Sequence, residues 1–107
     1  MELLPESIKK TLPKLGSTEG TAGADKVAVV KYFFPAGRYT LYVVEGGQEG
    51  DDFTFFGYCV SALGADCDEW GYASLAELRD MKVRGLKMER DLHFKPTKMS
   101  EIFKDMK

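Results

Sequence analysis

Three consecutive segments of the chain have the residue pattern of β-strands. Residues 26–34, 38–45 and 52–63 are rich in β-branched and aromatic residues, which favour extended backbone. The connections, residues 35–37 and 46–51, contain proline or glycine and are too short for a parallel crossover. The pattern therefore predicts an antiparallel three-stranded meander. Within its third strand, Gly57 indicates a β-bulge or a close approach of another backbone.

Short amphipathic helices and one more strand are predicted around this meander. Residues 4–12 repeat apolar side chains at four-residue spacing before a proline. Residues 74–77 (SLAE) fit a capping box, which predicts a helix that starts near Leu75 and ends before residues 84–85. Residues 86–94 alternate as in a half-buried strand, with Arg90 on the apolar side, and residues 98–106 form a last helix.

These elements predict an α+β fold in the order α-βββ-α-β-α. We expect an antiparallel sheet of about four strands, a β-meander plus one later strand, with short helices on one face. The length of 107 residues and the hydrophobic content of 44% are typical of a single domain, residues 1–107. The sequence has no apolar run of about 18 residues, and residues 1–10 lack the basic and apolar regions of a secretory signal, so we do not expect one. We therefore expect a cytoplasmic protein that does not enter membranes, with Cys59 and Cys67 as free thiols.

Charge is distributed unevenly along the chain. The net charge is −2, yet residues 39–78 contain eight acidic residues and no Lys or Arg, whereas residues 79–107 contain nine basic and five acidic residues. Such an acidic block can bind a basic partner, or its charges can pair across the fold or simply face water. We do not expect direct nucleic-acid binding, because phosphate would be repelled where the aromatic residues would have to stack on bases. The candidate partner-binding residues are Glu49, Asp51, Asp52, Asp66, Asp68 and Glu69.

Few residues are suited to catalysis or to metal binding. The single histidine, His93, lies beside Asp91 on the polar side of its predicted strand, so it is either a general base or an exposed residue. A zinc site would need Cys59, Cys67, His93 and Asp66 or Asp68, but the cysteine spacing matches no ligand knuckle. The acidic clusters at residues 49–52 and 66–69 lack the spacing of a calcium-binding loop. The sequence also lacks a glycine-rich phosphate-binding motif. We predict no catalytic residue, no cofactor and no metal.

Arg90 requires a partner if it faces the core, because a buried charge is tolerated only when it is paired. The expected carboxylate is Glu45, which ends an apolar strand, or one in the acidic loop around Asp68. The pair would be either a polar site at the sheet or a structural ion pair.

The order of several motifs resembles a bacterial and phage family, the proteins of unknown function DUF2958. The run ERDL-x-F-KP at residues 89–96 is the most specific of them. The other motifs are LLPESIKKTLPKL (residues 3–15), KYFFPAGRYTLYVVE (31–45), DFTFFGYCV (52–60), EWGYASLAEL (69–78) and SEI (100–102).

The resemblance implies that the protein is carried by plasmids, integrative elements or phages, often near anti-restriction genes, and that it has no established reaction. It also implies a polar signature of unassigned role, formed by Glu45, Tyr72, Glu89, Arg90 and Asp91. His93 departs from the tyrosine that is common at its position, which weakens it as a catalyst.

These observations favour a small acidic, non-enzymatic module that binds a protein encoded by the host or by the element. Inhibition of a host defence nuclease, of the anti-restriction or anti-CRISPR type, would follow if the acidic block occupied a basic nucleic-acid groove. One alternative is an enzyme or ligand-binding domain in which Tyr72, Glu89, Arg90 and Asp91 converge in a pocket. Another is a homodimeric accessory protein of plasmid or phage maintenance, joined through an uncovered sheet face.

Overall fold

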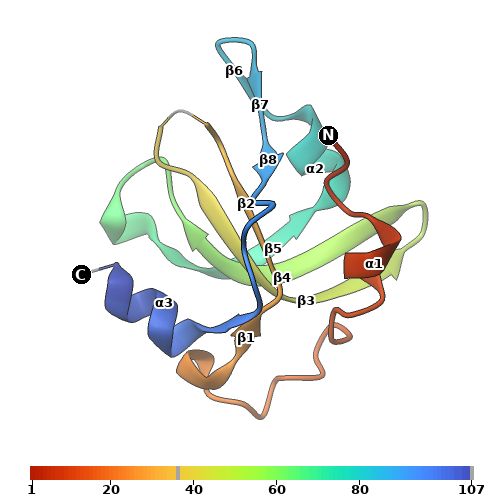
Figure 1. Cartoon of the computed structure of the whole chain (residues 1–107), viewed down its shortest axis with the longest axis vertical. Helices are drawn as coiled ribbons and strands as arrows, with labels where there is room; N and C mark the ends of the chain where they lie inside the picture. Colours follow the sequence, from red (N-terminus) through yellow and green to blue (C-terminus); the bar gives the residue numbers. More distant parts are fainter. Residues whose placement is uncertain (36, 107) are drawn as a thin grey trace.

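The computed structural model describes residues 1–35 and 37–106. At its centre is a five-stranded antiparallel sheet with the strand order β5-β4-β3-β2-β8 (Figure 1). Its strands are β2 (Val30–Phe33), β3 (Thr40–Glu49), β4 (Asp52–Val60), β5 (Glu69–Ser74) and β8 (Glu89–Arg90). Two small pairs lie outside this sheet, β1 (Val27–Ala28) with β9 (Thr97–Lys98) and β6 (Lys82–Val83) with β7 (Leu86–Lys87). The predicted α+β class and antiparallel meander are confirmed.

The helices lie on both faces of the sheet, whereas the sequence predicted that the short helices would lie on one face. They are α1 (Glu6–Lys9), α2 (Leu75–Asp80) and α3 (Met99–Asp105), with two 3₁₀ turns, η1 (Gly23–Asp25) and η2 (Ala65–Cys67). Leu75 and Leu78 of α2 join the larger core cluster on one face, together with Leu12, which follows α1. Met99 and Ile102 of α3 pack in a second cluster on the other face. In Figure 1, α1 and α3 accordingly lie at opposite margins of the molecule.

The sequence did not predict strand β5 of the central sheet. β5 pairs with β4 over six residues, from Glu69 opposite Cys59 to Ser74 opposite Thr54. Its sequence, EWGYAS, is short and contains a glycine and an acid, so it carries little of the β-branched pattern that identified the other strands. The helix after it was predicted correctly, because Ser74 and Glu77 form the expected capping box at the start of α2.

The glycine pair at residues 46–47 does not form the predicted turn. Both residues continue β3, and the chain reverses at Gly50, whose φ is +62°. A Cβ on Gly46 would lie 2.5 Å from a ring carbon of Phe53, and one on Gly47 would lie 3.2 Å from Leu15. These glycines therefore make room for packed side chains. The other predicted turn, at residues 35–37, includes Ala36, which lies outside the described residues.

A β-bulge interrupts the pairing of β3 with β4. Val43 pairs with Gly57 and Glu45 pairs with Phe56, so Val44 is the extra residue. A Cβ on Gly57 would lie 2.1 Å from the carbonyl oxygen of Tyr42, which confirms the predicted close backbone approach. Side chains of a regular strand alternate between the faces. The extra residue therefore turns Glu45 away from the face of Val43 and onto that of Phe56.

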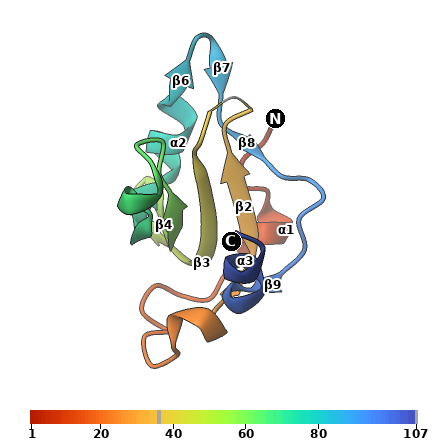
Figure 2. The ribbon, with the colours of Figure 1, turned by 90° about the vertical axis from the view of Figure 1, so that its left-hand side faces the viewer.

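The predicted strand over residues 86–94 is divided into two short pieces. A hairpin of β6 and β7 turns at Arg84 and Gly85, with φ of +54° and +81°, and it projects from the body of the molecule (Figure 2). Only β8 then pairs with the central sheet. Met88 is buried, but Leu92 is 61% exposed. The half-buried strand is therefore shorter than the alternating pattern of residues 86–94 predicted.

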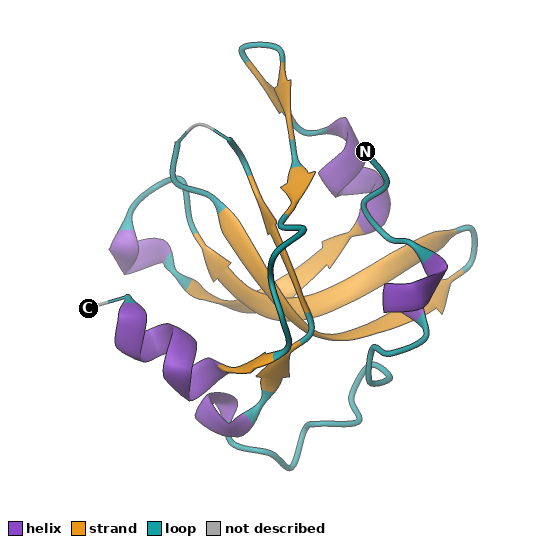
Figure 3. Cartoon of the chain, viewed as in Figure 1, coloured by secondary structure: helices purple, strands orange, loops and turns teal. Residues whose placement is uncertain are grey.

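The helices are all short, and loops connect most of the elements (Figure 3). Within the described ranges, none of the helices has the length and apolarity needed to cross a bilayer.

Candidate functional site

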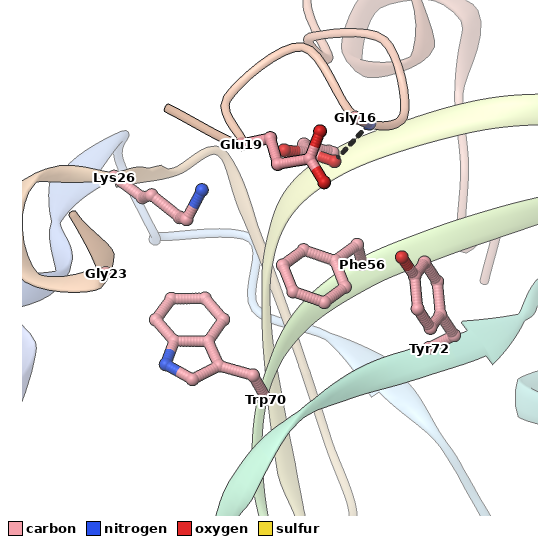
Figure 4. A pocket seen from close by; sticks show the side chains of 8 residues that line it. Gly16, Glu19, Gly23, Lys26, Phe56, Trp70 and Tyr72 are labelled. Atoms are coloured by element: carbon pink, nitrogen blue, oxygen red, sulfur yellow. Dashed lines mark hydrogen bonds between the residues drawn. The ribbon is translucent and has the colours of Figure 1, made fainter. Parts of the chain in front are cut away.

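A pocket of about 340 Å³ lies between the segment of residues 16–26 and strands β3, β4 and β5. One wall is aromatic and consists of Phe56 on β4 with Trp70 and Tyr72 on β5 (Figure 4). The Phe56 and Trp70 rings are stacked, with centroids 5.7 Å apart and planes 15° apart. The facing wall is formed by Gly16, Glu19, Gly23 and Lys26.

Glu45 is the buried carboxylate of this pocket, and only 3% of the residue is exposed. Its Oε1 accepts a hydrogen bond from the Gly16 N–H at 2.7 Å (Figure 4). Its Oε2 accepts hydrogen bonds from the Thr18 N–H, at 3.1 Å, and from the Thr18 hydroxyl. The ammonium of Lys26, also buried, donates to the Thr18 hydroxyl at 2.8 Å and to the Thr18 carbonyl. Thr18 therefore bridges two buried charges.

The pKa of the Glu45 carboxyl reflects opposing effects. Burial raises it, but the hydrogen bonds from Thr18 and Gly16 and the positive charge of Lys26 together lower the pKa below its ordinary value of 4.5. The carboxylate is thus held in its ionised form by its hydrogen-bond donors.

This network fastens the segment of residues 16–26 onto the sheet. The carbonyl of Lys26 also accepts a hydrogen bond from the Met99 N–H at 2.8 Å, which connects the segment to α3. The charged groups of Glu45 and Lys26 are both engaged in these hydrogen bonds, which hold the segment of residues 16–26 against the sheet. The groups of the pocket that remain accessible are its aromatic wall, of which Tyr72 is 72% exposed, and the exposed carboxylate of Glu19.

The structure divides the polar signature suggested by the family resemblance. Glu45 and Tyr72 line the same pocket. Glu89 and Arg90 form β8 at the far edge of the sheet, and Asp91 follows them. Asp91 accepts a hydrogen bond from the His93 backbone N–H and lies 3.7 Å from the Lys31 ammonium. The five residues therefore do not converge on one pocket.

Arg90 does not form the expected ion pair. Its Nε donates to the carbonyl of Glu2 at 3.2 Å. Both expected partners are engaged elsewhere, Glu45 by Thr18 and Gly16, and Asp68 by Arg38. Arg90 is only half-buried, so water and one carbonyl suffice to solvate its charge.

The six candidate partner-binding acids lie at the two ends of β4. Glu49, Asp51 and Asp52 belong to the β3–β4 hairpin, whereas Asp66, Asp68 and Glu69 lie beyond the other end of β4, around η2 and the start of β5. Figure 1 shows the two regions on opposite sides of the molecule.

Two of these six acids have structural roles. Asp68 accepts two hydrogen bonds of 2.7 Å from the Arg38 guanidinium, which lower the pKa of its carboxyl most strongly, and one from the Ser61 N–H. Asp52 accepts hydrogen bonds from the N–H groups of Phe53 and Ala76, and the first of these is the main cause that lowers its pKa. Arg38 stands one position before the base-free block of the sequence, residues 39–78, but it lies beside Asp68 of that block in the fold.

The other four acids face solvent. Glu49, Asp51, Asp66 and Glu69 are exposed, and within the described part of the chain none of them forms an ion pair. They are the free carboxylates of the acidic block.

The cysteines and the histidine are not assembled into a site. Cys59 is half-buried against the core, and burial raises the pKa of its thiol. Cys67 and His93 are exposed. Across residues 1–35 and 37–106, no group of three His, Cys, Asp or Glu residues is placed to hold a metal ion, so the zinc arrangement considered above does not form.

The family of the chain is decided by a match over nearly its whole length. A family model described as "Protein of unknown function (DUF2958)" matches residues 3–106. The chain belongs to the DUF2958 family. Comparison of this DUF2958 protein with curated proteins and with solved structures found no match.

Some residues of the pocket in this DUF2958 protein were missed by the sequence analysis. Lys26 was predicted only as the start of a strand, and no helix, strand or role was predicted for Thr18 or Trp70. The single tryptophan was the only available signal, because an isolated large aromatic often lines a binding surface. Thr18 and Lys26 carry no local signal, because Lys26 donates to Thr18, and Glu45, which accepts from Thr18, is distant in sequence and reaches it only through the bulge.

Proposed function

We propose that this protein is a non-enzymatic module that binds the basic surface of another protein. We further propose that the partner is a defence nuclease of the host and that the carboxylates occupy its nucleic-acid groove. The observation that carries the proposal is the set of four free carboxylates near the two ends of β4, within a stretch of sequence, residues 39–78, that contains no base.

The spacing of the acids supports occupation of an extended groove. β4 separates the two acidic regions and has nine residues. At about 3.3 Å per residue the regions are on the order of 30 Å apart. A nucleic-acid duplex covers that distance in about nine base pairs, at about 3.4 Å each. Carboxylates at such a separation can meet cations along a groove that normally holds phosphates.

The arrangement gives less support to the alternatives. Catalysis by Glu89, Arg90 and Asp91 would require a shared pocket with Tyr72, which lines a different region of the molecule. Dimerisation through an uncovered sheet face would require such a face, whereas core clusters pack on both sides of the sheet.

Affinity capture with matched variants tests the proposal. The test variant neutralises the free carboxylates by Glu49→Gln, Asp51→Asn, Asp66→Asn and Glu69→Gln, and leaves the structural Asp52 and Asp68 intact. The control variant neutralises four exposed acids elsewhere, by Glu2→Gln, Glu6→Gln, Glu101→Gln and Asp105→Asn. Both variants have the same net charge, so only the position of the charges differs.

We expect the wild-type protein and the control variant to capture the same nuclease from a host lysate, as identified by mass spectrometry. We expect the test variant to bind the purified nuclease at least about tenfold more weakly than the wild-type protein does, because complementary charge increases the rate at which the two proteins associate. Equal binding by the test and control variants would refute the proposed surface.

A further inference from the structure

β5 is an edge of the central sheet that is open to another strand. The strand order places β5 at one edge and β8 at the other. β8 has only two residues, and the N-terminal residues cover it, since the Arg90 N–H lies 3.1 Å from the Met1 sulfur. β5 has six residues, and within the described residues it pairs only with β4.

The backbone of β5 directs hydrogen-bonding groups outward at defined positions. The Ser74 N–H donates to the Glu77 side chain, not to β4, so it points to the free side of the strand. The N–H and C=O groups of an antiparallel strand point alternately to its two sides. Those of Tyr72 and Trp70 therefore also point outward, toward the position that an added strand would occupy.

A hollow lies on each side of this edge. On one face is the aromatic pocket of Phe56, Trp70 and Tyr72. On the other face is a second hollow of about 380 Å³ that includes Leu63, Glu69 and Gly71 in its lining. A Cβ on Gly71 would meet no atom within 4 Å, so the space beside this position is open. Side chains of an added strand alternate between the faces and would enter the two hollows in turn.

The surroundings of the edge favour a basic occupant. Glu69 lines the second hollow, Glu19 lines the first, and Asp66 stands just before β5. All three are exposed. Leu63, 86% exposed, supplies an apolar surface beside Glu69. An arginine or lysine can place its aliphatic stem on such a surface and its charged group at the carboxylate.

We propose that β5 accepts an extended basic segment of the partner protein as an additional antiparallel strand. The proposal rests on the proposed protein-binding function and specifies its mode. Hydrogen bonds to Trp70 and Tyr72 supply affinity, and a basic side chain opposite Gly71 supplies specificity.

Hydrogen exchange with a defined probe tests the mode of binding. The probe is an acetylated and amidated octapeptide in which arginine and valine alternate, added to the ¹⁵N-labelled full chain. At saturation we expect the amides of Trp70 and Tyr72 to exchange at least about tenfold more slowly, because each gains a hydrogen-bond acceptor.

A backbone variant separates strand addition from attraction by charge. Tyr72→Pro removes an outward N–H, which an edge strand tolerates, whereas Tyr72→Ala keeps that N–H and removes the same side chain. We expect the proline variant to bind the probe about tenfold more weakly than the alanine variant. Gly71→Leu tests the hollow without altering the backbone pairing, and we expect it to weaken binding about fivefold by occupying the space of the incoming side chain.

Each other outcome has a definite meaning. If the probe binds but Trp70 and Tyr72 stay unprotected and the two Tyr72 variants bind equally, strand addition is wrong while the charge-based function stands. Absence of binding at millimolar probe also overturns strand addition. Protection that appears without probe and grows with protein concentration would assign the edge to a second copy of the chain. Failure of the proposed function itself would appear in the other experiment, as equal binding of the captured nuclease by the control variant and by the test variant that lacks the four free carboxylates.

Discussion

Single residues determine where the buried carboxylate of this protein lies. Leu41, Val43 and Glu45 occupy alternate positions, and simple alternation would direct Glu45 into the larger core. The extra residue Val44 moves the carboxylate to the other face, where Thr18 and Gly16 donate to it. The sequence showed an acid at the end of an apolar strand, but it contained no signal for the bulge except Gly57 on the partner strand.

Replacement of Glu45 tests this network through pH. The folded-state pKa of Glu45 is lowered, so its stabilising contribution is complete above the ordinary value of 4.5 and is lost as the pH falls through the lower folded value. We expect Glu45→Gln to reduce the free energy of unfolding at pH 7 by about 1–3 kcal/mol and to flatten its decline in acid. Urea denaturation across this pH range measures both effects. The exposed Glu49→Gln is the control, and an equal acid response in both variants would contradict the role of Glu45.

Two glycines of adjacent strands should differ strongly in their sensitivity to an added methyl group. A Cβ on Gly57 would clash with the Tyr42 carbonyl, whereas one on Gly71, directly opposite in β5, would enter open space. We expect Gly57→Ala to reduce the free energy of unfolding by about 2–4 kcal/mol and Gly71→Ala to change it by less than about 1 kcal/mol. Thermal and chemical denaturation of the two variants provide the measurement. Similar stabilities would show that β3 and β4 are not so closely apposed.

At the scale of elements, the sequence predicted those whose pattern is long and uniform. The three central strands are rich in aromatic and β-branched residues, and α2 has a capping box, so each was identified near its observed position. β5 and the β6–β7 hairpin were not identified. Both are short, and tertiary pairing and the positive φ of Arg84 determine them more than local preference does.

The capping box of α2 offers a test at this scale. The Ser74 hydroxyl accepts from the Glu77 N–H at 3.1 Å, while the Glu77 carboxylate accepts from the Ser74 N–H at 3.0 Å. We expect Ser74→Ala to reduce the free energy of unfolding by about 1 kcal/mol. Ser100→Ala, at an exposed position within α3, is the matched control and should have a smaller effect. Equal losses in urea denaturation would indicate that the cap contributes nothing specific.

At the scale of the whole molecule, the fold places the free carboxylates of the acidic block near the two ends of β4. The sequence contains an acidic block, but it does not indicate which of the carboxylates in the block are paired within the fold. Arg38 neutralises Asp68, and two backbone N–H groups engage Asp52, so four of the six candidate acids remain free. Such distinctions require the fold, because donor and acceptor are up to 30 positions apart.

Binding through these free carboxylates predicts a particular kinetic signature. Exposed charges at an interface act mainly on the rate of encounter and are screened by salt. We expect the association rate with the captured nuclease to fall steeply as ionic strength rises, and the dissociation rate to change much less. Surface plasmon resonance over a salt series measures both rates. An association rate that is independent of salt would contradict attraction by charge.

Competition with nucleic acid tests the central claim most directly. The captured nuclease is loaded with a short fluorescent DNA duplex at fixed salt, and the DUF2958 protein is titrated into the complex while fluorescence anisotropy is followed. If its carboxylates occupy the nucleic-acid groove, the duplex is released competitively, and the four-acid variant requires at least about tenfold more protein for the same release. A ternary complex, in which the duplex stays bound while the protein also binds, would contradict the account.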